Sequence, residues 1–289
     1  MVRPSPDPCT FWLVSGYIDP RTLGRSGLVS SRLGLGSGYG VDADDVEYAV
    51  DRGVTWLTWG PRLGSFGEGI RRVARRSRDQ ITITLQSYTR VASLLAPLLG
   101  RSLKKLGIDH ADVLALGWWN EPPPPRILDA ALGALDRGMA RHLIISCHHR
   151  PTFASFIADP RYAAIMVRYN AAHPGAEKDI FPLLDGRVVH ERPGVISYTA
   201  TRWGKLLDPK LTPPGERTPR ASDCYRFALS NPHVDVTLTG PKDRAQLDEA
   251  LTALDRGPMS DDELAWMRRV GANVRAVTRS RRPPFSWFS

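Results

Sequence analysis

The stretch "ITITLQSYTRVASLLAPLLGRSLKKLGIDHADVLALGW" (residues 81–118) decides the fold. It holds two apolar runs, 81–88 and 112–118, each of the length and composition of a buried strand. Between them, residues 91–107 carry apolar residues at helical spacing and close with two lysines and Gly107, which are signals of a helix end. A strand, a helix and a strand with short connections predict two neighbouring parallel strands.

The same alternation runs along the rest of the chain. Six further strand-like runs occupy residues 32–37, 54–59, 142–146, 164–169, 194–199 and 234–240. Helical patterns separate them, such as "DADDVEYAVDRG" (42–53), which opens with acidic residues and closes on a glycine. Eight strands joined in this way predict an α/β fold with one (β/α)8 TIM barrel over residues 33–255.

Segments on both sides of the barrel extend this prediction. Residues 21–32 are expected to form a hairpin that closes the bottom of the barrel. Residues 259–279 predict an extra amphipathic helix outside it, because apolar residues recur there at helical spacing: Leu264, Met267, Val270 and Val274. Residues 1–20, rich in proline, fit neither a signal peptide nor a membrane span and are expected to be a disordered leader, which leaves 21–289 as the domain.

Composition and charge narrow the class of protein. Of 289 residues, 42% are hydrophobic and 24% are charged, as in an ordinary globular protein. The net charge is +9, but only six of the 39 basic residues are lysines and the arginines are scattered, which argues against a nucleic-acid partner. Three widely spaced cysteines suit neither a metal cluster nor a disulfide framework, so we expect a cytoplasmic protein without a metal and without a membrane partner.

In such a barrel the functional residues lie at the C-terminal ends of the strands. Strand alternation places Met166, Arg168 and Asn170 on the inward side, so Arg168 is expected to point into the mouth. Its guanidinium suits a substrate carboxylate or phosphate. The alternative is an ion pair with a framework acid such as Glu121 or Glu177, and the sequence leaves both open.

Histidines follow the fifth and sixth predicted strands. They are His148, His149 and His173, and histidine is the side chain that ordinarily exchanges protons near neutral pH, so each is a candidate for proton exchange with a substrate. His148 shares the inward parity of Ser146, and His173 lies in a short loop that can fold back over the mouth. We therefore take His173, His148 and Arg168 as candidate catalytic residues, with a structural role as the alternative for each histidine.

Three segments resemble the aldo-keto reductase superfamily. "RTLGRSGLVSSRLGLGSG" (21–38) resembles its N-terminal hairpin and first strand, "SYTATRWGKLL" (197–207) its cofactor loop after strand 7, and "TGPKDRAQLDEAL" (239–251) its adenosine-phosphate segment after strand 8. The resemblance spans residues 21 to 256. It implies the barrel fold and an NADPH-dependent reduction of carbonyl compounds.

The catalytic residues of that family are missing. The family uses an Asp, a Tyr, a Lys and a His, and the matching positions here hold Thr58, Leu63, Gln86 and Gly117. In the family the Tyr protonates the carbonyl oxygen, the Lys–Asp pair lowers its pKa and the His orients the substrate. Leu63 cannot donate a proton. The chain therefore resembles a divergent member that lacks the standard mechanism.

The cofactor contacts implied by the resemblance are kept in part. Ser146 and Tyr198 match residues that hold and stack on the nicotinamide, and the remaining matches lie in the two cofactor segments: Thr199, Arg202, Lys242, Gln246 and Glu249. Cys147 and Met166, however, replace an Asn and a Gln. Asp243 stands where a hydroxyl residue meets the 2′-phosphate, and an acid there repels a phosphate. Both NADP and NAD therefore stay open as cofactors.

Aromatic residues complete the predicted substrate site. Trp119 shares the parity of Gly117, so we expect its ring to fill the space of the absent His and to stack on a flat substrate, whereas Trp118 is expected to pack beneath the loops. The other residues predicted to bind substrate are Trp59, Tyr169, Asn170 and Gln86. The expected partner is a small, anionic and aromatic molecule.

Three functions stay open. The first, our preferred hypothesis, is an NAD(P)H-dependent reductase in which a His or Arg replaces the family's Tyr as the acid. The second is a cofactor-independent lyase, isomerase or cyclase, which the lost Asn and Gln contacts favour. The third is a non-catalytic binding or regulatory barrel, against which the polar and aromatic mouth argues.

The missing acid generates a first prediction. Because Leu63 and Gly117 cannot replace the family's Tyr and His, we expect reduction of a simple aromatic aldehyde by NADPH to be far slower than is typical of the superfamily. The measurement is the loss of NADPH absorbance with benzaldehyde as substrate. A rate typical of the superfamily would contradict the argument from the missing acid.

Overall fold

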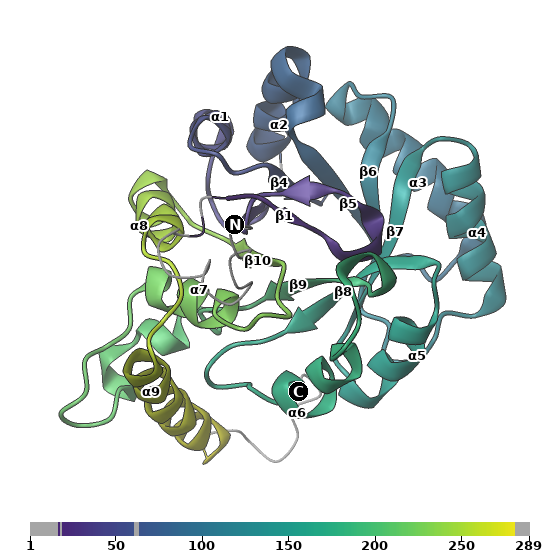
Figure 1. Cartoon of the computed structure of the whole chain (residues 1–289). Helices are drawn as coiled ribbons and strands as arrows, with labels where there is room; N and C mark the ends of the chain where they lie inside the picture. The colour runs from purple at the N-terminus through teal and green to yellow at the C-terminus, as the bar shows by residue number, and fades with distance from the viewer. Residues whose placement is uncertain (1–16, 18, 61–63, 281–289) are drawn as a thin grey trace, which may run out of the picture.

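The computed structural model describes Tyr17, residues 19–60 and residues 64–280. Eight parallel strands close into one barrel in the order β10-β3-β4-β5-β6-β7-β8-β9 (Figure 1). They are β3 (Leu33–Gly36), β4 (Trp56–Trp59), β5 (Thr82–Ser87), β6 (Ala111–Leu116), β7 (Ala140–Cys147), β8 (Tyr162–Arg168), β9 (Gly194–Tyr198) and β10 (Val236–Thr239). The predicted (β/α)8 TIM barrel is confirmed.

Helices surround the barrel in the order that the sequence predicts. They are α1 (Ala43–Asp51), α2 (Gly64–Ser77), α3 (Ala92–Leu106), α4 (Pro125–Asp136), α5 (Phe153–Ala158), α6 (Ala176–Asp179), α7 (Ala221–Leu229) and α8 (Arg244–Asp255). Local signals set their ends. Asp42 and Asp45 form a capping box at the start of α1, and α3 ends where Gly107 adopts a left-handed conformation with φ of 65°.

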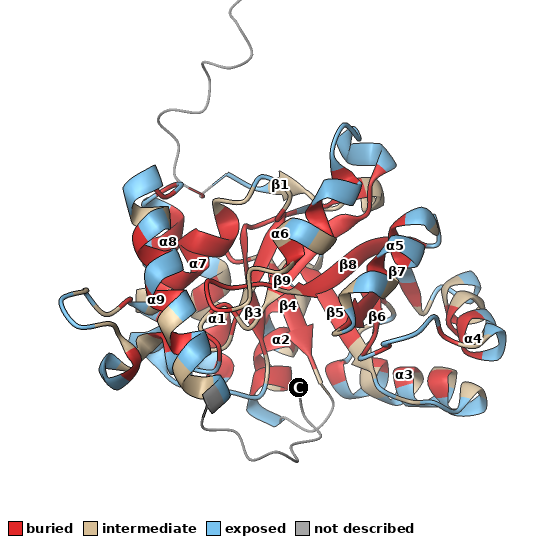
Figure 2. Ribbon diagram, turned by 90° about the horizontal axis from the view of Figure 1, so that it is seen from below, coloured by how far each residue is buried: buried red, intermediate tan, exposed pale blue. Residues whose placement is uncertain are grey.

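The barrel strands are buried along most of their length (Figure 2), and strand alternation divides their side chains into two layers, one inside the barrel and one between strands and helices. The interior holds Trp56, Met166 and Ile196 among others, whereas Leu57 and Ile165 face the helices. Trp56 is the largest interior side chain. Its indole Nε1 donates a hydrogen bond to the Thr58 hydroxyl at 3.0 Å, so its one polar atom is satisfied inside the barrel.

The predicted hairpin lies at the bottom of the barrel and crosses it in Figure 1. Its strands are β1 (Arg21–Thr22) and β2 (Val29–Ser30), and Leu23 between them is fully buried with the interior cluster. Tyr17, inside the segment predicted to be a disordered leader, is also buried, and its hydroxyl donates to Ser230 at 3.3 Å. Residues 1–16 and residue 18 of this segment lie outside the described residues.

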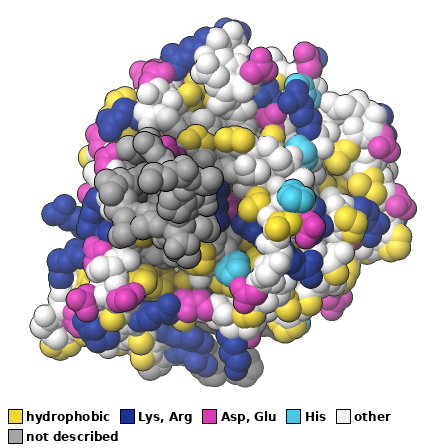
Figure 3. Space-filling view, in the orientation of Figure 1, with side chains coloured by type: hydrophobic (Ala, Val, Ile, Leu, Met, Phe, Trp, Pro, Cys, Tyr) yellow, Lys and Arg dark blue, Asp and Glu magenta, His cyan; other side chains and the backbone are white. Residues whose placement is uncertain are grey.

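The predicted C-terminal helix is present as α9 (Asp261–Ser280). Met267, Val270 and Val274 are fully buried on its inner face, and α9 packs against α7 and the loop after β9. Glu263 near its start forms a salt bridge with the buried Arg226 of α7 at 2.6 Å. Among the described residues, no helix is long and apolar enough to span a membrane. On the face seen in Figure 3, acidic and basic side chains are intermixed.

A buried ion pair joins β10 to the chain before β9. Asp235 is fully buried and accepts hydrogen bonds from both terminal nitrogens of Arg192 at 2.8 Å and from the backbone N–H of Val195 at 2.8 Å. Arg21 of β1 approaches the same carboxylate at 3.3 Å. The buried carboxylate of Asp235, directly before β10, therefore binds groups from the hairpin, from β9 and from the chain before β9.

Removal of that carboxylate leaves a buried arginine without its counter-charge. We expect Asp235→Ala to lower the free energy of unfolding by about 3–5 kcal/mol, measured by urea denaturation. The control is Asp51→Ala, which removes the exposed partner of Arg76 and is expected to cost less than about 1 kcal/mol. Equal losses in the two variants would contradict this role for Asp235.

Candidate functional site

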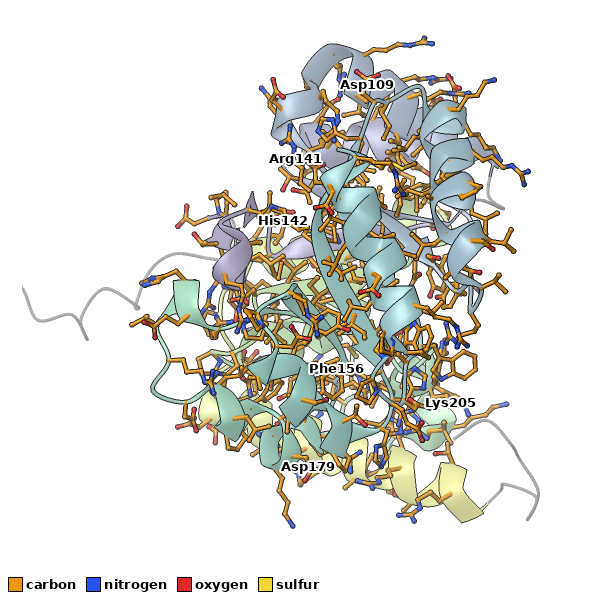
Figure 4. All side chains as sticks on the ribbon, turned by 90° about the vertical axis from the view of Figure 1, so that its right-hand side faces the viewer. Asp109, Arg141, His142, Phe156, Asp179 and Lys205 are labelled. Atoms are coloured by element: carbon orange, nitrogen blue, oxygen red, sulfur yellow. The ribbon has the colours of Figure 1, made fainter. Side chains whose placement is uncertain are left out.

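The candidate site lies at the C-terminal ends of the strands, at the opposite end of the barrel from the hairpin. Lys205, in the loop after β9, marks this end in Figure 4, whereas Arg141 and His142 at the start of β7 lie toward the hairpin. Non-glycine residues with positive φ occur only in the loops after β6 and β9 among the described residues: Trp118, Thr199, Arg202 and Trp203. Each such conformation costs about 1–3 kcal/mol, so the surrounding contacts must hold these loops in place.

Three rings form a stack across the mouth. The His148 ring lies 5.6 Å from the Trp118 ring and 5.9 Å from the Tyr198 ring, measured between centroids. Ser146 fixes this arrangement, because its hydroxyl oxygen accepts a hydrogen bond from the Trp118 backbone N–H at 2.8 Å. The predicted catalytic His148 and the predicted cofactor residues Ser146 and Tyr198 are thus brought together.

Arg168 influences this stack electrostatically. Burial lowers the pKa of His148, and the positive charge of Arg168 lowers it further, so the imidazole is mostly neutral at neutral pH. Burial raises the pKa of Tyr198, and its hydroxyl donates to the Cys147 carbonyl at 3.2 Å. Glu177, one of the two acids considered as a partner for Arg168, instead pairs with Arg268 at 2.9 Å.

The positions of the family's catalytic residues now carry other interactions. Thr58 is buried and accepts the hydrogen bond from Trp56, while Leu63 lies outside the described residues. Gln86 is half-buried near the end of β5. At Gly117 an added Cβ would lie 2.5 Å from Cε1 of the Tyr88 ring and 2.6 Å from its Cδ1. The Tyr88 ring therefore occupies the space beside Gly117.

The two neighbouring tryptophans do not lie where strand parity predicts them. Trp119 does not fill the space beside Gly117; it is 8% exposed, and the Arg90 guanidinium stacks on its ring at 3.8 Å. Trp118 is 45% exposed and contacts His148 instead of packing beneath the loops. The reason is that strand alternation stops at the end of β6, where the backbone of Trp118 turns to a φ of 60°.

His173 belongs to a different group of contacts from His148. Asn170 is fully buried, and its side-chain oxygen accepts from the backbone N–H groups of Ala172 and His173 at 3.0 and 2.9 Å. Its amide nitrogen donates to the Thr199 carbonyl at 2.8 Å. Asn170 is thus used to hold two loops together, which leaves its predicted contact with substrate without support.

Arg202 holds the His173 ring. Its guanidinium lies 2.9 Å from Nε2 of His173 and donates to the Thr278 hydroxyl of α9 at 2.6 Å. The Nδ1 atom of His173 lies 3.0 Å from the same guanidinium nitrogen, so the whole ring edge faces Arg202. Arg202 and His173 therefore connect the loops after β8 and β9 to α9.

Two of the predicted substrate-binding residues face the helices. The Tyr169 ring packs on Phe181 at 5.1 Å and on Phe227 at 5.6 Å, and its hydroxyl donates to Glu177 at 2.6 Å. Trp59 is fully buried in the outer layer. Both rings pack in the layer between strands and helices, which leaves their predicted contact with substrate without support.

The adenosine-phosphate segment forms the start of α8. Asp243 is its N-cap residue, and the carboxylate accepts a hydrogen bond from the Gln246 backbone N–H at 2.9 Å. The Gln246 side chain in turn accepts from the Lys242 backbone N–H at 3.1 Å. The carboxylate of Asp243 thus takes the place of an anion at this helix N-terminus.

A cleft of about 420 Å³ lies between α7 and α8. Its lining residues are Arg217, Arg220, Ser222, Glu249, Thr252 and Arg256. Glu249 accepts a hydrogen bond from the Ser222 hydroxyl at 2.7 Å, and the buried Asp223 pairs with Arg217 and Arg256 at 2.8 and 3.0 Å. The three arginines were missed by sequence reasoning, although "ERTPRASD" (216–223) places two of them directly before α7.

No protein-family model matches the chain. Solved structures do: an aldo-keto reductase from Bacillus halodurans in its holo form has a TM-score of 0.74 at 16% identity, over 87% of this chain and 96% of that chain. An aldo/keto reductase from Klebsiella pneumoniae in complex with NADP and acetate has a TM-score of 0.71 at 18% identity, over 87% and 96%. An aldo-keto reductase from the same organism in complex with NADPH has 0.69 at 18%, over 88% and 95%. The chain therefore has the fold of these aldo-keto reductases.

Proposed function

We propose that this protein is a nicotinamide-dependent reductase of the aldo-keto reductase type with a substitute proton donor. The observation that carries the proposal is the arginine-lined cleft at Glu249, the residue that the resemblance assigns to the adenosine. Ser146 and Tyr198, assigned to the nicotinamide, lie together at the mouth. Structural neighbours crystallised with NADP and NADPH support the same cofactor class.

The described residues fit the adenosine half of a dinucleotide better than the nicotinamide half. Arginine side chains suit phosphate oxygens, and the Glu249 carboxylate is able to accept a hydrogen bond from an adenine amino group. At the mouth, a nicotinamide stacked on Tyr198 would contact the same ring that His148 contacts. The cofactor, when bound, would supply hydride, and the protein has to supply a proton.

His148 is the side chain placed to supply that proton. It is half-buried in the mouth between Trp118 and Tyr198, whereas His173 is held by Arg202. A protonated His148 ring is able to donate to an oxygen of a bound substrate and to recover its proton from solvent. Arg168 favours the neutral imidazole, and so favours release of the proton.

A cofactor-independent enzyme is the second candidate. The observation in its favour is that Cys147, at a position where the family contacts the nicotinamide amide with an Asn, is buried with its Sγ 3.1 Å from the His149 carbonyl. Burial raises the pKa of this thiol to about 11, so it stays protonated. Such an enzyme would use His148 for proton transfer and Arg168 to bind an anionic substrate, and would not bind a dinucleotide.

Dinucleotide binding separates the two candidates. We expect NADPH or NADH to quench the tryptophan fluorescence of the protein, and Arg220→Ala to weaken the binding about tenfold, because it removes a charged hydrogen-bond donor to a phosphate. The control is Arg161→Ala, which removes an arginine paired with Asp159 outside the cleft. Absence of binding of both dinucleotides, or an unchanged affinity of Arg220→Ala, would contradict the reductase proposal.

The pH dependence of turnover tests the proton donor. Because the pKa of His148 lies below its ordinary value of 6.5, kcat/KM for an aromatic aldehyde that carries a carboxylate should fall as the pH rises through a value below 6.5. His148→Phe keeps an aromatic ring between Trp118 and Tyr198 but cannot donate. We expect it to lose this pH dependence and about 10²-fold in kcat. A pH profile identical to that of the wild type would exclude His148 as the donor.

A further inference from the structure

A tyrosine covers a glycine at two places on the rim of the barrel mouth. The ring of Tyr88 lies against Gly117, at the end of β6, where any side chain would collide with it. The ring of Tyr39 lies against Gly240 at the end of β10, where an added Cβ would be 2.4 Å from its Cδ2. Both rings come from loops that follow other strands, β3 and β5. The glycines therefore make room for phenol side chains.

Arg90 fixes the Tyr88 ring in this position. Its guanidinium donates to the carbonyl oxygens of Tyr88 at 3.2 Å, Gly117 at 3.1 Å and Trp118 at 2.6 Å, while it stacks on Trp119. The backbone N–H of Gly117 also donates to the Ser87 carbonyl at 2.8 Å. These hydrogen bonds hold the loops after β5 and β6 together, and they thereby fix the position of Tyr88.

The Tyr88 hydroxyl is able to act as a hydrogen-bond donor in the mouth. Tyr88 is 58% exposed, so a ligand can reach it. Burial of the phenol raises its pKa above the ordinary value of 10.0, and the nearby Tyr39 phenol raises it further. Arg90 donates to the carbonyl oxygens of both Tyr88 and Trp118, so Tyr88 lies on the same side of the mouth as the Trp118 end of the ring stack. Tyr88 therefore keeps its proton at neutral pH.

We propose that Tyr88 binds and orients the substrate through a hydrogen bond from its hydroxyl to a substrate oxygen, in place of the His that Gly117 replaces. This inference rests on the proposed function for the identity of the site, but it concerns ligand binding and not the transfer of hydride. The ligand class is an aromatic carboxylate or aromatic carbonyl compound. Its ring can contact the exposed Trp118 ring, which lies beside the loop of Tyr88.

The experiment is calorimetric titration of the protein with benzoate, without any dinucleotide. We expect the wild type to bind benzoate and Tyr88→Phe, which keeps the ring over Gly117, to bind about tenfold more weakly. Gly117→Ala displaces the ring and should weaken binding at least as much. Tyr48→Phe is the control, because the Tyr48 hydroxyl donates to Asp248 on the outer surface at 2.7 Å, and its affinity should be unchanged.

The outcomes separate this inference from the reductase proposal. Benzoate affinity of Tyr88→Phe equal to that of the wild type, with an unchanged unfolding midpoint, would overturn the role of Tyr88, as would a wild type that does not bind benzoate. Loss of affinity in Tyr88→Phe together with no binding of NADH or NADPH would support Tyr88 and refute only the reductase. In steady-state kinetics the same variant should raise KM more than it lowers kcat.

Discussion

Closure of eight strands into one barrel is the constraint on which the other features depend. Since successive side chains of a strand point to opposite faces, only alternate residues reach the interior and the mouth. The interior is filled by Trp56, Met166 and Ile196. At the mouth side of this layer, the Trp56 indole donates a hydrogen bond to the Thr58 hydroxyl. A ligand therefore has to bind above this level, among the residues at the strand ends.

The replaced catalytic positions are consistent with one another physically. A lysine or aspartate left alone inside the barrel would be an uncompensated buried charge, and neither Thr58 nor Gln86 carries one. At the fourth position, Gly117 makes room for the Tyr88 ring, which comes from the loop after the neighbouring strand β5. In the proposed site, three neutral side chains take the place of the charged groups that the resemblance implies: His148, Tyr88 and Tyr198.

Sequence patterns predicted the barrel, the hairpin and α9, because each depends on periodic burial within one segment. Strand alternation also gave Ser146 and His148 the same inward parity, and the ring of His148 lies against that of Tyr198. Trp59 and Tyr169 follow the same alternation and lie on the outer face, next to the inward-facing Thr58 and Arg168. Tyr88 and the arginines of the α7–α8 cleft were missed, because their positions depend on packing between segments far apart in the sequence.

The most direct test of the account is a crystal structure of the protein grown with NADPH and benzoate. The account predicts adenosine in the cleft lined by Glu249 and Arg220, the nicotinamide ring against Tyr198, and a benzoate oxygen within hydrogen-bond distance of the Tyr88 hydroxyl. A mouth without either ligand at saturating concentrations, or benzoate bound elsewhere, would contradict the claim that this barrel end is a working reductase site.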